Sequence, residues 1–90
     1  MTHRIDQAVD HQGVRFVFQG RLDRPALDGL VALCQARLRN GEPVRVVLGA
    51  GTQIETGLVD EILQIQGIEL RAESPFLSRL IEGGTREENT

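Results

Sequence analysis

One stretch decides the fold: Val44-Arg45-Val46-Val47-Leu48, which follows Pro43 and leads into Gly49-Ala50-Gly51. It is a short run of mostly β-branched apolar residues bounded by proline and glycine, which is typical of a strand inside a sheet with both faces covered. A strand in that position needs a neighbour on each side. The residues before and after it are therefore expected to supply further strands, and helices that cross over between them.

Two strands are expected upstream of this stretch. Val14, Phe16 and Phe18 recur at a period of two, which is typical of a strand. The segment Asp10-His11-Gln12-Gly13 has the composition of a tight turn, and residues 4–9 before it have weaker strand character. The sequence therefore predicts that the first two strands form a hairpin.

The first helix is marked at both ends. Asp23 suits the N-cap and Pro25 an early helical position, where its missing N–H would have no intrahelical partner. Asn40-Gly41 suits the left-handed residue that ends a helix. Between them, apolar residues recur at helical spacing: Leu27, Leu30, Val31, Cys34 and Leu38.

Downstream, the pattern predicts a second helix over about Thr56–Gln64, a fourth strand over 68–72 and a third helix. That last helix starts at Ser74-Pro75 and is expected to stop at Gly83-Gly84. The order β-β-α-β-α-β-α predicts an α/β fold with a mixed four-stranded sheet and three helices, both crossover helices lying on one face. The expected core includes Leu30, Cys34, Val46, Leu48, Ile62, Leu63, Leu70 and Leu80. Residues 1–84 form the expected domain and residues 85–90 a disordered tail.

Composition and charge exclude several classes of partner. The chain of 90 residues has a net charge of −3, so it has no basic footprint for nucleic acid. No run of about 18 apolar residues occurs, so no membrane insertion is expected. The N-terminus has no apolar run typical of a signal peptide, and the single cysteine, Cys34, suits a reducing compartment. A cytoplasmic location is expected.

Three segments together resemble the STAS domain of bacterial anti-sigma factor antagonists. Val17-Phe18-Gln19-Gly20-Arg21-Leu22-Asp23 is similar to the strand and Gly-x-Leu-Asp pattern that precede the family's first helix. Val46-Val47-Leu48, followed by Ile54-Glu55-Thr56-Gly57-Leu58, is similar to the strand, the loop and the Asp-Ser-Ser-Gly-Leu start of the second helix. Leu70-Arg71-Ala72-Glu73-Ser74-Pro75-Phe76-Leu77 is similar to the last strand and the Ser-Pro start of the final helix.

The resemblance implies a non-catalytic, protein-binding regulator of transcription that works by partner switching and needs no cofactor. Its partner would be an anti-sigma factor of the serine-kinase type. Thr56 stands where the family has its phosphorylated serine, and Glu55 is the acid nearest to the family's aspartate. The residues that would contact the partner are Thr52, Gln53, Glu55, Thr56, Gly57 and Asp60. As an alternative, the altered motif suits a constitutive subunit of a larger assembly, such as the STAS subunit of a bacterial lipid-transport ATPase.

Each candidate residue also has a purely structural interpretation. Thr56 could cap the second helix, or Thr52-Gln53-Ile54-Glu55 could form a capping box that starts it earlier. Gly49-Ala50-Gly51 lacks the third glycine of a dinucleotide-binding loop and the Gly-Lys-Ser/Thr of a Walker loop, so it is interpreted as a connection. His3 and His11 are interpreted as surface residues rather than metal ligands, and Cys34 as a buried apolar residue. No catalytic set of residues is recognised.

Overall fold

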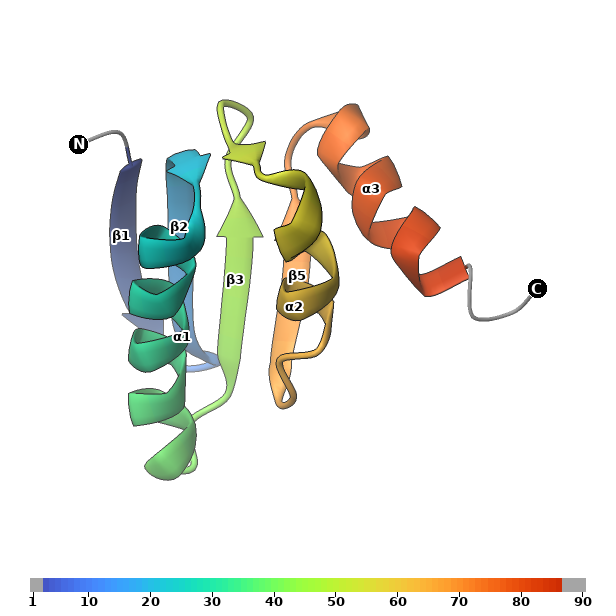
Figure 1. Cartoon of the computed structure of the whole chain (residues 1–90). Coiled ribbons are helices and arrows are strands. Elements are labelled where there is room, and N and C mark those ends of the chain that lie inside the picture. The colour runs from blue at the N-terminus through green and yellow to red at the C-terminus, as the bar shows by residue number, and fades with distance from the viewer. Residues whose placement is uncertain (1–2, 87–90) are drawn as a thin grey trace.

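The fold is a single mixed sheet with the two crossover helices packed on one face and the last helix beside the last strand (Figure 1). This computed structural model describes residues 3–86, apart from the side chains of residue 56 and residues 82–86. In chain order the elements are β1 (His3–Asp10), β2 (Gly13–Leu22), α1 (Arg24–Arg39), β3 (Val44–Leu48), β4 (Gln53–Ile54), the 3-10 turn η1 (Thr56–Leu58), α2 (Val59–Leu63), β5 (Ile68–Ala72) and α3 (Pro75–Arg86).

Strand pairing confirms the α/β class and the mixed sheet. The strand order is β1-β2-β3-β5, with β1 antiparallel to β2 and the pairs β2–β3 and β3–β5 parallel. The register places Phe16 beside Val46 and Val46 beside Leu70. The short strand β4 was not predicted, because two residues are too few to show a period; it pairs with the end of β2.

The core lies between the sheet and the helices. Alternate residues of β2 and β3 point into it, and α1 and α2 cover them from the same face, as the handedness of the crossovers predicts (Figure 1). The largest side chains with almost no exposure are Phe16, Phe18, Leu22, Leu27, Leu30, Leu48, Ile62 and Leu77. The described part of the chain therefore has one continuous apolar core.

Five of the eight predicted core residues are fully buried and three are half-buried. The buried ones are Leu30, Cys34, Val46, Leu48 and Ile62. Leu63, Leu70 and Leu80 pack against the core but keep part of their surface exposed. All three lie at the β5 side of the molecule, where the sheet ends and α2 is only five residues long.

The prediction that both faces of β3 are covered is wrong. Val44, Val46 and Leu48 are buried, whereas Arg45 and Val47 on the other face are half-buried. Charged side chains share this second face, among them Arg15 of β2 and Arg71 of β5, which are exposed. The apolar run of β3 therefore did not distinguish a strand covered on one face from one covered on both.

Both ends of α1 and the N-terminus of α3 follow the prediction, whereas the C-terminus of α3 does not. The side chain of Asp23 accepts a hydrogen bond from the backbone N–H of Ala26 at 3.1 Å, and Gly41 has a φ of 78° after α1. The hydroxyl of Ser74 accepts from the N–H of Leu77 at 3.1 Å. Gly83-Gly84 does not stop α3, which continues to Arg86. The first two residues of the predicted tail are thus helical, and the remaining four lie outside the described residues.

Candidate functional site

The loop that follows β3 is fixed to β2 through one carbonyl group. The Phe18 carbonyl oxygen accepts hydrogen bonds from the Gly49 N–H at 2.7 Å and from the Thr52 hydroxyl at 3.1 Å. The N–H of Thr52 donates to the Gly49 carbonyl at 3.0 Å, which closes a tight turn. Thr52 is 6% exposed, so its hydroxyl holds the loop and is not available at the surface.

Beyond Thr52, the chain runs alongside the end of β2. Gln53 pairs with Arg21 and Ile54 with Leu22, and the N–H of Glu55 donates to the Leu22 carbonyl at 3.2 Å. The carboxylate of Glu55 lies 3.5 Å from the guanidinium of Arg21. The segment before the second helix is therefore held in place by backbone pairing, with an ion pair on its exposed side.

The second helix starts at Thr56 and not at Thr52. Residues 56–58 form the 3-10 turn η1, in which the Leu58 N–H donates to the Glu55 carbonyl at 2.9 Å, and the α-helix proper begins at Val59. The capping-box alternative is wrong, because the Thr52 hydroxyl donates to Phe18 and the side chain of Glu55 makes no cap hydrogen bond. The side chain of Thr56 lies outside the described part of the structure, so its capping or phosphorylation stays a prediction.

A second ion pair joins the starts of the two crossover helices. Arg24 at the N-terminus of α1 donates to both carboxylate oxygens of Glu61 in α2, at 2.7 Å for one of them, and Asp28 lies 3.8 Å from the same guanidinium. The hydrogen bond lowers the pKa of Glu61 and raises that of Arg24. Neither residue was singled out from the sequence, because the residues are 37 positions apart and only the fold brings them together.

Of the six predicted partner-contact residues, Gln53, Glu55, Gly57 and Asp60 are exposed. We call these four residues the loop surface. They lie along one continuous segment, from β4 into the first turn of α2, and Gln53 and Glu55 line a shallow hollow together with Arg21 and Ile54. Arg21 was not predicted as a site residue, although it lies inside the Gly-Arg-Leu-Asp pattern, which is the signal that points to it.

The two histidines lie far apart, at opposite ends of β1, and the cysteine is buried. His3 stacks on the ring of Phe18, with centroids 5.5 Å apart, whereas His11 lies in the turn at the opposite end of β1. Within residues 3–86, no three His, Cys, Asp or Glu residues are grouped so that they could hold a metal ion. Cys34 has no exposed surface, and its burial raises the pKa of its thiol to about 11, which keeps the thiol in its unreactive form at neutral pH.

No helix in the described part of the chain combines the length and the apolar character needed to cross a membrane. Comparison of the chain with protein families, with curated proteins and with solved structures finds no match in any of the three. The resemblance to STAS domains therefore depends on the three sequence segments alone.

Proposed function

We propose that this chain is a non-catalytic, protein-binding regulator of a partner-switching system, similar to the anti-sigma factor antagonists, and that the loop surface contacts its partner. The proposal rests on the difference in burial between the inner and outer sides of residues 52–58. Thr52 and Leu58 are buried and hold the segment against the core, whereas Gln53, Glu55 and Gly57 between them are exposed. A segment held from beneath presents its outer side chains in a fixed arrangement, which lowers the entropy lost on binding.

Phosphorylation at Thr56 is the proposed switch. Thr56 directly follows Glu55, and Asp60 lies four residues further on, so a phosphate here would add nearly two negative charges to a surface that is already acidic. The added charge would repel an acidic partner or break a packed interface.

The alternative is a constitutive subunit of a larger assembly, for example of a lipid-transport ATPase. The Arg21–Glu55 ion pair favours it, because the acid that stands closest to the family's aspartate is already partnered within the chain. A loop with this internal contact could bind a partner permanently without being switched. The two functions share one docking surface and differ in whether residue 56 is modified.

A capture experiment distinguishes the two functions. The full chain and its variants Thr56→Glu and Gln12→Glu are used as bait in an extract of the source cells, and captured proteins are identified by mass spectrometry. Gln12 is exposed in the β1–β2 turn, at the opposite end of the strands from the loop surface, so it controls for the added charge. The regulator proposal expects a serine-kinase-type anti-sigma factor that is lost with Thr56→Glu and kept with Gln12→Glu.

The outcome that contradicts the regulator proposal is equally specific. If a transporter ATPase is captured equally by the wild type and by both variants, the constitutive-subunit function replaces the regulator function.

Incubating the captured kinase with ATP and the chain tests whether Thr56 is a switch. We expect one added phosphate on the wild type and none on Thr56→Ala; an unmodified wild-type mass in the presence of the active kinase would refute the switch.

A further inference from the structure

β5 is the last strand in the order of the sheet, and its outer edge pairs with no other strand among residues 3–86. The N–H of Glu73, just beyond the strand, donates to the Leu48 carbonyl of β3 at 2.9 Å. Because backbone groups of successive residues in a strand point to alternate sides, those of Ile68, Leu70 and Ala72 point away from β3. The outer edge therefore offers backbone donors and acceptors to an incoming strand.

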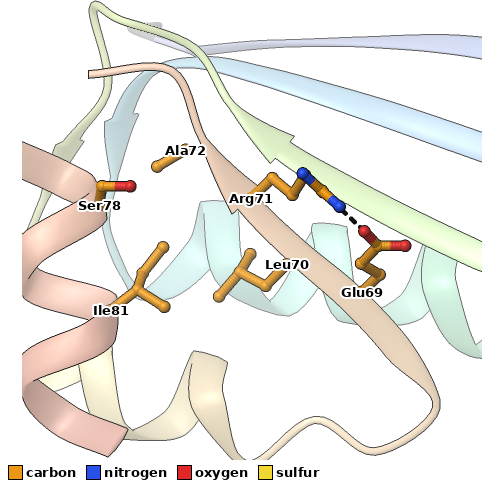
Figure 2. A pocket seen from close by; sticks show the side chains of 6 residues that line it. All are labelled: Glu69, Leu70, Arg71, Ala72, Ser78 and Ile81. Carbon is orange, nitrogen blue, oxygen red and sulfur yellow. Dashed lines mark hydrogen bonds and ion pairs between the residues drawn. The ribbon is translucent and has the colours of Figure 1, made fainter. Parts of the chain in front are cut away.

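A groove runs beside this edge (Figure 2). Its floor is the strand segment from Glu69 to Ala72, and its far wall is α3, from which Ser78 and Ile81 face Ala72 and Leu70. Leu70 and Ala72 are half-buried, although they lie on the sheet face that carries the core elsewhere. The apolar side of the edge strand is thus only partly covered by its own chain.

The sequence of β5 is complementary to itself. We propose that a second copy of this chain docks at this edge, the two β5 strands pairing antiparallel about Leu70. In this register Leu70 faces Leu70 of the second copy, and Ile68 faces Ala72, so all apolar side chains meet on the groove side. On the other side, Glu69 of each copy faces Arg71 of the other, which places opposite charges in register.

The backbone agrees with this register. The residues whose N–H and C=O groups point outward are Ile68, Leu70 and Ala72, and these are the ones that form hydrogen-bonded pairs, with about six new backbone hydrogen bonds. Glu69 and Arg71 then occupy the non-hydrogen-bonded positions, where facing side chains approach most closely. A register centred on Glu69 or on Arg71 instead would place identical charges opposite each other, which is unfavourable.

The opposite edge of the sheet, β1, has a similar alternation of charges but fewer apolar residues at the positions that would pair. On β1, pairing about Ile5 would place Arg4 opposite Asp6 of a second copy. The residues that flank Ile5 on the same side are His3 and Gln7, so this pairing joins one apolar pair and two polar ones. Pairing through β5 joins apolar residues at all of its outward-facing positions, which is why the second copy is assigned to that edge.

The test reverses one charge at a time. In Glu69→Arg two arginines of one copy face two arginines of the other, and in Arg71→Glu two glutamates face two glutamates, so each variant alone repels itself. An equimolar mixture restores opposite-charge contacts, but only in a heterodimer of the two variants. Sedimentation velocity of the full chain, over a range of concentrations, is the measurement. Both side chains are largely exposed, and circular dichroism verifies that each variant is folded.

We expect the wild type to form a dimer, each variant to dimerise about tenfold more weakly or worse, and the mixture to recover the wild-type affinity. The control pair Arg4→Asp and Asp6→Arg, on β1, should leave dimerisation unchanged both singly and mixed. A wild type that stays monomeric at millimolar concentration would overturn the proposal. The assignment to this edge would be overturned if the mixture of the two β5 variants did not recover the wild-type affinity. It would also be overturned if the two β1 variants weakened dimerisation singly and restored it when mixed.

Discussion

Replacing Thr52 with valine tests whether this residue supports the loop after β3. Valine has nearly the same shape, so the substitution removes the hydroxyl that donates to the Phe18 carbonyl and changes little else. That carbonyl keeps the 2.7 Å hydrogen bond from Gly49, so it is not left unpaired in the interior. The expected loss is therefore the net value of one hydrogen bond, about 1 kcal/mol of the free energy of unfolding, and not the larger cost of a buried unpaired acceptor.

Urea unfolding followed by far-UV circular dichroism measures this loss, because the chain has no tryptophan or tyrosine to report by fluorescence. A loss of about 1 kcal/mol moves the urea midpoint by roughly 0.3–1 M at an unchanged slope. Amide hydrogen exchange of Thr52, whose N–H donates to Gly49, should become about fivefold faster if the loop opens more often. Thr52→Ser keeps the hydroxyl and should leave this exchange rate close to that of the wild type.

Two results would refute the reasoning about Thr52. A loss above about 3 kcal/mol would mean that Gly49 alone does not satisfy the Phe18 carbonyl. A variant as stable as the wild type, with loop amides that exchange at the same rate, would mean that the hydroxyl does not hold the loop. In that case the contrast between the inner and outer sides of the segment would no longer support the proposed docking surface.

Three further predictions concern the core, the thiol and one turn. Leu30→Ala should cost about 2–5 kcal/mol in urea unfolding, whereas Leu33→Ala on the exposed side of α1 should cost far less; equal costs would contradict the helix orientation. The Cys34 thiol, with its pKa raised to about 11, should resist iodoacetamide at pH 8 until the chain unfolds. Because the folded chain keeps this proton when the unfolded chain releases it, the free energy of unfolding should fall as pH rises from about 8.5 toward 11, and a flat profile would contradict the burial. Gly13→Ala should cost about 1–3 kcal/mol or more by thermal unfolding, because φ is 117° and a Cβ would lie 2.3 Å from the Pro43 carbonyl oxygen; an unchanged midpoint would refute that geometry.

The sequence predicted the elements whose signals are local. The period of two in β2, the caps at Asp23 and Ser74 and the turn before Gly13 all act within a few residues of themselves, and the structure confirms them. The parallel pairing of β2, β3 and β5 also followed, because a helical crossover returns the chain to the same end of the sheet. The favoured hand of these crossovers placed both helices on one face. The extent of α3 did not follow, because packing of its apolar face can outweigh the low helix propensity of Gly83-Gly84.

The candidate site was less accessible to sequence reasoning. The sequence predicted which residues form the loop but not the direction of each side chain. That direction depends on the pairing of β4 with β2, which joins Gln53 to Arg21 across more than thirty residues. For this reason Thr52 was predicted at the surface and lies beneath it, whereas Arg21 was not considered. The ion pair between Arg24 and Glu61 is hidden from the sequence in the same way.

Strand β2 has a position that also bears on how the chain is made. It pairs with β1 on one edge and with both β3 and β4 on the other. The β1–β2 hairpin is complete once residue 22 has left the ribosome, but the strand that covers the second edge of β2 is synthesised more than twenty residues later. At translation rates of 5–20 residues per second, roughly one to several seconds pass with that edge of β2 unpaired. During this interval the unpaired edge of β2 is open to pairing with a strand of another chain.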